Sequence, residues 1–506
     1  MRFGIRVDAS AESGLGHVKR CLALAHALHS RRAEVLFVTR DHGVDTAAVI
    51  RSEGFAVQVL PRGEARTQPR PAAPRHASWV GVPWALDATE TATALRTASR
   101  RVDWVIVDHY GLDANWHTRV TSDLGCRVCI VDDLADRPIG GHLLIDHNLE
   151  PDHHAKYATQ GGGAHRILGG PRYALLGPSY AEASPCEVTD PVASIGIFMG
   201  GMDAGNASVL ALGACREHAG FTGFIEIAAT RANPNLPQLM SICERDSGLR
   251  IVVDQPDLSG FFARHGLQVG AGGGASWERC RVGAPTIALV CADNQAGVVR
   301  ELVARGVVRS PAESTAASLG QEVSSLLNDV GARRQLSANA GALVDGRGAE
   351  RVALTLMSDS LGLRNATASD APLTHVWRND DSTRRYAWDG APIALTHHFA
   401  WWESSLTSAK RRLLMAEIGG RPVGVFRLDL EGSTAVISLY LDPSLHGLGL
   451  GTAMLLAGQH WVREHAPGVL RLEGKVQAVN HSSAAAFAAA GFARTGDVLW
   501  VWQAKA

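Results

Sequence analysis

Residues 3–38 read FGIRVDASAESGLGHVKRCLALAHALHSRRAEVLFV. Apolar residues fill most of positions 3–7, a glycine-containing turn follows, and apolar side chains then recur at helical spacing from Val18 to Leu28. A second apolar run begins at Val35. This order of strand, helix and strand is a βαβ unit, which implies parallel strands joined by a right-handed crossover. The stretch therefore predicts an α/β fold.

The same alternation continues outward from this unit. Short apolar runs at residues 104–107 and 128–131 end in acidic residues, Asp108 and the pair Asp132-Asp133. A second series of strands is predicted at residues 194–199, 224–228, 249–253, 267–269 and 286–290. We therefore expect two Rossmann-like lobes, a first lobe over residues 1–180 and a second lobe over residues 181–360.

The pattern changes after residue 360. Residues 361–371 are polar and lack periodicity, so we expect a linker there. Apolar runs at 413–417, 423–428 and 435–441 then predict consecutive antiparallel strands, followed by a glycine-rich turn, a helix over about 452–464 and a final strand at 498–502. Residues 372–506 are therefore predicted to form an α+β domain with a mixed, mostly antiparallel sheet.

Bulk properties exclude several classes of protein. The chain has 506 residues and a formal net charge of -1, which provides no basic field for nucleic acid. It has no apolar run near the ~20 residues of a membrane span, and no export signal follows Met1. Eight cysteines are too few for a disulfide scaffold in a chain of this length. We expect a cytoplasmic protein; its oligomeric state is left open.

No metal site is expected. Cys126 and Cys129 form a CxxC motif without a second pair. His142, His147 and the pair His153-His154 lack helical i,i+4 spacing and a cysteine partner. Strand and loop roles explain these residues better than metal binding does.

The turn after the first strand predicts a first site. Gly14 and Gly16 permit a sharp turn and a close approach of the backbone to a ligand. His17 follows at the start of the predicted helix, where the positive end of the helix dipole disfavours the imidazolium form. A neutral imidazole suits a general base, and either Asp8 or Asp108 would orient its ring. The alternative is that His17 only caps the helix.

A second glycine-rich turn, Gly272-Gly273-Gly274, again lies between a predicted strand and a predicted helix. Free backbone N–H groups at such a turn suit a pyrophosphate. Glu278 is placed to accept hydrogen bonds from ribose hydroxyls, and the polar segment 293–295 follows the next strand. The alternative is that both loops serve only as turns.

Four segments together resemble the UDP-sugar hydrolase of pseudaminic acid biosynthesis, which has the two-lobed GT-B fold. They are residues 14–20, 108–111, 199–203 and 272–278, the last continuing to Asp293-Asn294-Gln295. The resemblance implies metal-independent release of UDP from UDP-2,4-diacetamido-2,4,6-trideoxy-β-L-altrose by water, with inversion. It implies His17 as the base, supported by Asp8 or Asp108. The substrate-binding residues expected from the turns and from the resemblance are Gly14, Gly16, Lys19, Arg20, His109, Tyr110, Gly272, Gly273, Gly274, Ser276, Glu278, Asn294 and Gln295.

The C-terminal domain resembles a GCN5-related N-acetyltransferase (GNAT). The resemblance rests on the turn from Leu441 to Thr452, whose glycines expose N–H groups to a pyrophosphate, and on the region around Asn480. It implies acetyl-CoA as co-substrate. The implied acetyl-CoA-binding residues are Leu441, His446, Gly447, Gly449, Gly451, Thr452, Asn480 and Phe487.

One residue departs from the family pattern. Phe487 stands where many members carry a tyrosine that protonates the departing thiolate, and a phenyl ring cannot donate a proton. Either water or another residue supplies this proton, or the domain is slow or inactive. Glu417 and Glu473 are candidate bases for an ammonium substrate, although surface carboxylates are the simpler interpretation.

Both resemblances predict a fusion of consecutive steps, because the pseudaminic acid pathway acetylates the 4-amino sugar nucleotide just before it releases UDP. Fusion would raise the local concentration of the intermediate. The expected partners are a UDP-amino sugar and acetyl-CoA. The alternative is a GT-B glycosyltransferase that uses a UDP-sugar donor and carries a degenerate CoA-binding GNAT domain.

Overall fold

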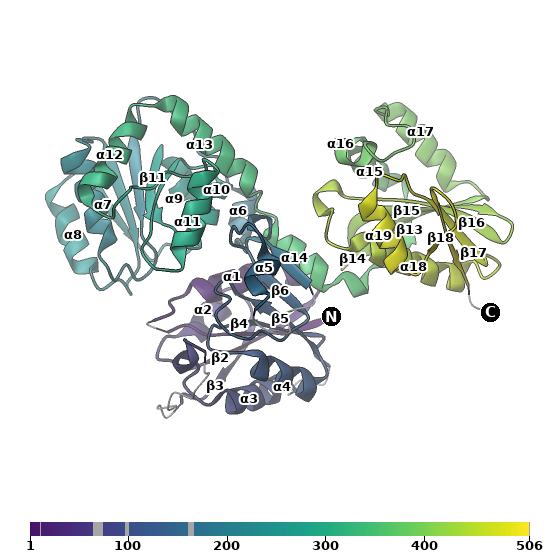
Figure 1. Cartoon of the computed structure of the whole chain (residues 1–506), viewed down its shortest axis with the longest axis horizontal. Helices are drawn as coiled ribbons and strands as arrows, with labels where there is room; N and C mark the ends of the chain where they lie inside the picture. The colour runs from purple at the N-terminus through teal and green to yellow at the C-terminus, as the bar shows by residue number, and fades with distance from the viewer. Residues whose placement is uncertain (11, 64–73, 97–100, 160–165, 505–506) are drawn as a thin grey trace. The chain divides into compact units, whose positions relative to one another are not determined.

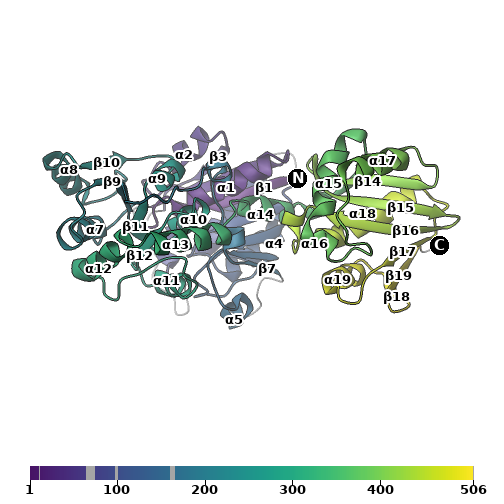
Figure 2. The ribbon, with the colours of Figure 1, turned by 90° about the horizontal axis from the view of Figure 1, so that it is seen from above.

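A computed structural model describes the chain except residues 11, 64–73, 97–100, 160–165 and 505–506. The chain divides into two compact units, of which the larger covers most of residues 2–352 and the smaller contains Ala353–Ala506. The larger unit holds two parallel sheets and the smaller unit holds one mixed sheet, as Figures 1 and 2 show. This is the fold class that the sequence predicts: two Rossmann-like sheets followed by a mixed, mostly antiparallel sheet.

The first lobe is built on a parallel sheet in the order β3-β2-β1-β4-β5-β6-β7. Each residue of β1 is buried, as expected for a strand that helices cover on both faces. The strands are β1 (Arg2–Val7), β2 (Glu34–Arg40), β3 (Ala56–Leu60), β4 (Trp104–Asp108), β5 (Arg127–Val131), β6 (Leu143–Asp146) and β7 (Arg166–Gly169). The helices between them include α1 (Gly16–His29), α2 (Thr46–Ser52), α3 (Trp84–Arg96), α4 (Ala114–Leu124) and α5 (His153–Tyr157).

The second lobe contains a five-stranded parallel sheet in the order β10-β9-β8-β11-β12. Its strands are β8 (Ser194–Phe198), β9 (Phe224–Ala229), β10 (Leu249–Val253), β11 (Leu267–Ala271) and β12 (Thr286–Leu289). Its helices are α7 (Ala207–Gly213), α8 (Leu236–Arg245), α9 (Ser259–Arg264), α10 (Ala275–Arg281), α11 (Gln295–Ala304), α12 (Ala316–Leu327) and α13 (Val330–Leu343). The chain then continues into α14 (Gly348–Leu356).

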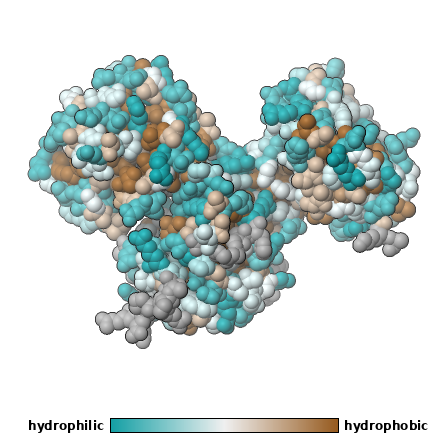
Figure 3. Space-filling model, viewed as in Figure 1, coloured by the Kyte–Doolittle hydropathy of each residue, from teal (hydrophilic) through white to brown (hydrophobic). Residues whose placement is uncertain are grey.

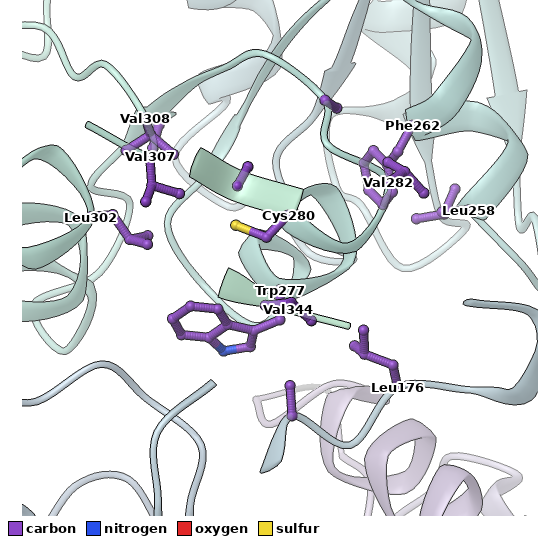
Figure 4. Packing of buried hydrophobic residues seen from close by; sticks show 14 of the residues in the cluster. Leu176, Leu258, Phe262, Trp277, Cys280, Val282, Leu302, Val307, Val308 and Val344 are labelled. Carbon is purple, nitrogen blue, oxygen red and sulfur yellow. The ribbon is translucent and has the colours of Figure 1, made fainter. Parts of the chain in front are cut away.

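The segment between these two sheets packs with the second lobe. It contains the short helix α6 (Pro178–Glu182). Leu176 and Tyr180 belong to a buried cluster with Trp277, Cys280 and Leu302, much of which Figure 4 shows. Burial of this apolar surface anchors the segment on helices α10 and α11.

The smaller unit contains a seven-stranded sheet in the order β13-β14-β15-β16-β17-β19-β18. Neighbouring strands are antiparallel except β16 and β17. The strands are β13 (Gly362–Asn365), β14 (Arg411–Ile418), β15 (Arg421–Glu431), β16 (Thr434–Leu441), β17 (Arg471–Lys475), β18 (Ala493–Arg494) and β19 (Leu499–Gln503). The helices are α15 (Ala371–Asn379), α16 (Asp381–Arg384), α17 (Leu395–Leu406), α18 (Leu450–His465) and α19 (His481–Ala489).

The expected linker at residues 361–371 is wrong. Gly362–Asn365 forms β13, which pairs with β14 at the edge of the sheet. Thr367 and Asp370 then form a capping box before α15. These residues are polar because an edge strand and a helix cap both face water on one side, not because they connect two domains.

On the face drawn in Figure 3, hydrophobic residues are interspersed with hydrophilic ones. In the described part of the chain, no helix combines the length and the apolar character needed to cross a membrane.

Candidate functional site

His17 and Asp108 come together at the carboxyl edge of the first sheet. His17 lies in the first turn of α1, and Asp108 is the last residue of β4, which neighbours β1. The Nδ1 atom of His17 lies 2.6 Å from Oδ1 of Asp108. Of the two carboxylates that the sequence leaves open as orienting groups, the structure places Asp108 on His17.

Arg20 keeps Asp108 ionised. It binds Asp108 through Nε at 2.5 Å and through a terminal nitrogen at 2.6 Å. Burial alone would raise the pKa of Asp108, but the positive charge of Arg20 and the contact with His17 lower it well below its usual range. Arg20, expected to bind substrate, is therefore a partner of Asp108.

The contacts of His17 also define its tautomer. A carboxylate only accepts hydrogen bonds, so Nδ1 of His17 must carry the proton that it shares with Asp108. The second contact at Nδ1, 3.1 Å from Arg20, then cannot be a hydrogen bond, because both atoms are donors. No described residue hydrogen-bonds Nε2, and in the neutral ring this atom carries the lone pair. This is the arrangement that a general base requires.

Asp8 has a different role from the one expected. Its carboxylate accepts hydrogen bonds from His42 Nε2 at 3.1 Å and from the backbone N–H of Arg40 at 2.7 Å, and His109 Nε2 lies 3.4 Å away. The buried Arg6 guanidinium forms an ion pair with it and holds its pKa well below the ordinary value, although burial opposes this. Asp8 orients two other histidines rather than His17.

These groups line one pocket together with the loop after β1. In that loop the hydroxyls of Ser10 and Ser13 each accept the backbone N–H of the other residue, which closes a compact turn. Gly14 follows with φ of 65°, a left-handed conformation that favours glycine. The lining residues are Asp8, Ser10, Ser13, His17, His42, Trp79, Asp108, His109 and Tyr110. Within the described residues, no group of three or more His, Cys, Asp or Glu side chains is placed to hold a metal ion.

Tyr110 forms one wall of the pocket. Its ring meets the His17 ring edge-on at 4.6 Å, and its hydroxyl donates a hydrogen bond to Asp133. Burial and the negative charge of Asp133 raise the pKa of Tyr110 well above its ordinary value. His147 interacts electrostatically with Asp133. Burial lowers the pKa of His147 to about 4.

Several of these residues escape sequence reasoning. Ser10, Ser13 and His42 lie in loops that follow strands or precede helices. Trp79 lies in a short 3₁₀ helix, Ala77–Val80, far along the chain from β3, and no sequence motif marks it as part of the site.

In the second lobe, the turn after β11 requires glycine at position 272 for lack of space. A Cβ on Gly272 would lie 2.2 Å from the Val299 side chain of α11, so backbone and helix touch there. A Cβ on Gly274 would meet nothing within 4 Å. Gln295 turns inward: its Oε1 accepts the backbone N–H of Cys291, and its Nε2 lies against Gly273.

The other residues that the sequence predicts to bind the nucleotide differ in their exposure to solvent. The Ser276 hydroxyl is buried and accepts a hydrogen bond from Arg279 at 3.2 Å, so it supports the turn from inside. Asn294 is exposed and begins α11 without a side-chain cap. Burial raises the pKa of Glu278, while the charge of Lys19 and a hydrogen bond with Tyr180 act against the rise. Lys19 itself is exposed.

In the smaller unit, two strands separate beside a glycine turn. The parallel pairing of β16 with β17 ends at Ile437 and Gly474, so β16 continues from Ser438 to Leu441 with one edge open. Gly447 and Gly449 then adopt left-handed conformations with φ of 83° and 75°. Helix α18 begins at Leu450 without a side-chain cap, so the N–H groups of its first turn, which includes Gly451 and Thr452, are available to an anion.

The other residues that the sequence predicts to bind acetyl-CoA lie near this separation of the strands. Asn480 uses its side-chain oxygen to cap α19 by accepting the N–H of Ser483. Phe487 is buried against Phe492, with ring centroids 4.9 Å apart, and against Gly474. His446 Nδ1 lies 3.5 Å from the hydroxyl of Ser382.

Both candidate bases of the acetyltransferase domain are engaged in ion pairs. Glu417 accepts a hydrogen bond from Arg364, and Glu473 accepts one from Arg471, each at 2.7 Å. Each carboxylate thus has a structural partner on its own sheet. The structure therefore favours the simpler interpretation of both residues.

Comparisons with known proteins agree with these two parts. Residues 373–492 match the acetyltransferase (GNAT) family. The C-terminal domain is a GNAT acetyltransferase domain. The chain is also 20% identical over 366 residues to the spore coat polysaccharide biosynthesis protein SpsG of Bacillus subtilis (strain 168), an alignment that covers 70% of this chain and 98% of SpsG. The two-lobed N-terminal part is thus distantly related to SpsG.

Solved structures resemble the same two parts. MurG of Acinetobacter baumannii is 15% identical, with a TM-score of 0.46, and covers 70% of this chain and 98% of its own. The aminoglycoside acetyltransferase AAC(6')-Ib with coenzyme A is 22% identical, with a TM-score of 0.26, and covers 28% of this chain and 94% of its own.

Proposed function

We propose that this chain is a bifunctional sugar-nucleotide enzyme of nonulosonic (pseudaminic) acid biosynthesis. Its acetyltransferase domain acetylates the 4-amino group of UDP-4-amino-4,6-dideoxy-N-acetyl-β-L-altrosamine with acetyl-CoA. Its two-lobed part then releases UDP from the product, UDP-2,4-diacetamido-2,4,6-trideoxy-β-L-altrose. The observation that carries the proposal is the contact between His17 and Asp108, which leaves Nε2 of the imidazole as a base in the pocket.

In the hydrolysis, Nε2 of His17 takes a proton from water as the water oxygen bonds to the anomeric carbon. The bond from that carbon to the diphosphate oxygen breaks, and UDP leaves with the electron pair. Asp108 stabilises the imidazolium that forms, as a buried carboxylate does in a catalytic triad. Attack from the face opposite UDP inverts the anomeric configuration.

The nucleotide is assigned to the second lobe. The Gly272–Gly274 turn offers backbone N–H groups to the diphosphate, and Asn294 is exposed at the start of α11. Glu278 accepts the ribose hydroxyls. Ser276 and Gln295 hold the turn, and their contacts with Arg279 and Cys291 support this role.

In the acetyl transfer, the neutral 4-amino group attacks the thioester carbonyl of acetyl-CoA. A C–N bond forms, the C–S bond breaks, the amine loses one proton to solvent, and the CoA thiolate takes one from water. Phe487 supplies none. The open edge of β16 and the first turn of α18 hold the pantetheine and pyrophosphate of the cofactor. The name of SpsG, a polysaccharide biosynthesis protein, supports a carbohydrate substrate for the two-lobed part.

One experiment tests both steps and their order. Purified protein receives the UDP-4-amino sugar with or without acetyl-CoA, and free thiol and UDP are measured together. We expect thiol to appear, and UDP release to depend on acetyl-CoA. UDP release only after addition of a sugar acceptor would favour the glycosyltransferase alternative. Absence of thiol would indicate a CoA-binding domain that does not catalyse.

A further inference from the structure

Three arginines gather on one face of the acetyltransferase sheet. Arg411 of β14 and Arg427 of β15 form ion pairs with Asp429, with Nε–O distances of 2.5 Å and 3.0 Å. Arg378 lies on α15, which packs against β16, the strand beside β15, and its positive charge acts on Arg427. Asp429 is the one carboxylate that the described residues place in contact with this group, which we call the arginine cluster (Arg378, Arg411, Arg427).

The arginine cluster has excess positive charge and free donors. Three guanidinium groups and one carboxylate leave a net charge of +2. Nη1 of Arg378 is buried and has no hydrogen-bond partner among the described residues. Arg427 is 30% exposed, so solvent and ligands reach it. Burial and the two neighbouring arginines lower its pKa, so an added anion would relieve an existing repulsion.

The arginine cluster lies near the place where β16 and β17 separate. Arg427 pairs directly with Ser438 in the register of β15 and β16. Ser438 is the first residue of β16 beyond the last pair with β17, where the open edge begins. Neighbouring strands lie about 5 Å apart. The arginine cluster is therefore one strand away from the place where the two strands separate.

Aromatic side chains complete this surface. The Trp401 ring of α17 lies 5.4 Å from the Arg411 guanidinium and 5.9 Å from that of Arg427. Tyr440 of β16 is partly buried near Thr374 and the same arginines. Such contacts hold the guanidinium planes in place at little entropic cost, so that their donors are preorganised.

We propose that the arginine cluster binds the diphosphate of the acceptor, so that the acetyltransferase domain is selective for amines carried on a nucleoside diphosphate. A diphosphate diester has two negative charges, which match the net charge of the arginine cluster, and guanidinium groups bind phosphate oxygens in pairs. A polyamine or another cationic acceptor would be repelled. The inference rests on the proposed acetylation of a UDP-amino sugar and adds the residues that select it.

The test is calorimetric titration of UDP into the full chain saturated with CoA. We expect the variant Arg378→Met/Arg427→Met to bind one UDP fewer per chain than the unaltered protein. Arg427→Lys, which keeps the charge, should retain that site with weaker affinity. Arg494→Met on β18 removes one charge at the far end of the sheet order and should change nothing. Retained binding of CoA by each variant shows that the domain is folded.

An unchanged number of UDP sites in Arg378→Met/Arg427→Met would overturn the inference. Kinetics separate it from the proposed function. With the UDP-4-amino sugar, the KM of the acceptor should rise about tenfold or more in this variant, as for loss of a charge-assisted hydrogen bond, while the KM of acetyl-CoA stays within about twofold. Normal acetylation with an unchanged acceptor KM in Arg378→Met/Arg427→Met would support the proposed function but show that the arginine cluster does not bind the acceptor. If the unaltered protein binds this UDP but does not acetylate the amino sugar, the arginine cluster keeps its role and the proposed function is wrong.

Discussion

His17 donates its Nδ1 proton to Asp108 across 2.6 Å, and Arg20 donates to both oxygens of the same carboxylate. The three residues form a connected set of charge-assisted contacts, and His17 lies at its end in the pocket. Asp108 lies at the end of a central strand, and Arg20 lies one turn after His17 on α1. The geometry therefore depends on rigid elements rather than on a loop.

Replacement of His17 separates the two proposed activities. His17→Ala removes the base, so UDP release should fall by about a hundredfold or more, while formation of free CoA thiol continues at its normal rate. His26→Ala is the control, since His26 lies on the same helix but pairs with Glu53 at the surface. Both products are measured in one reaction. Hydrolysis near the normal rate in His17→Ala would refute the assignment of the base.

Asp108→Asn tests the tautomer. An amide can donate to Nδ1, which moves the imidazole proton to Nε2 and removes the lone pair that activates water. We expect kcat for UDP release to fall about 10²- to 10⁴-fold with a small change in KM. Asp123→Asn, on α4 in a surface pair with Arg119, should leave kcat unchanged. A fall in affinity with kcat preserved would mean that Asp108 binds substrate instead.

The sequence predicts the sheets because their strands are buried. Residues 3–7 and 104–107 read as apolar runs, and both form central strands of the first sheet. Edge strands are harder to predict. β3 at the edge of this sheet is largely exposed, and β13 at residues 362–365 is polar, so neither gives an apolar signal.

The candidate site is predictable only where a motif identifies it. His17 lies after β1 and Asp108 ends β4, both in recognisable segments, and the structure brings them together. The choice between Asp8 and Asp108 depends on strand order and side-chain direction, which the sequence does not contain. His42 joins the pocket because β2 lies beside β1, and its contact with Asp8 spans 34 positions in the chain.

Two glycines in one turn distinguish support of the fold from contact with the nucleotide. Gly272→Ala places a methyl group within 2.2 Å of Val299, so the variant should lose about 1–3 kcal/mol of stability as well as UDP affinity. Gly274→Ala meets no protein atom within 4 Å, so its stability should be normal. If the diphosphate approaches this backbone, UDP affinity should still fall. Thermal unfolding and UDP titration check both variants, and normal affinity in Gly274→Ala would place the nucleotide elsewhere.

His117 makes stability depend on pH. Its ring is fully buried on α4, its Nδ1 accepts the N–H of Gly140, and burial lowers its pKa from 6.5 to about 3. Below pH 6.5 the His117 side chain binds a proton in the unfolded chain but not in the folded chain. The contribution of His117 to the free energy of unfolding is therefore fully present above pH 6.5 and decreases as the pH falls toward 3. At pH 5 the loss is about 2 kcal/mol. His117→Asn should flatten urea unfolding midpoints between pH 7.5 and 5, whereas His154→Asn, on exposed α5 surface, should not. An equal slope in His117→Asn and the unaltered protein would show that His117 is not the titrating group.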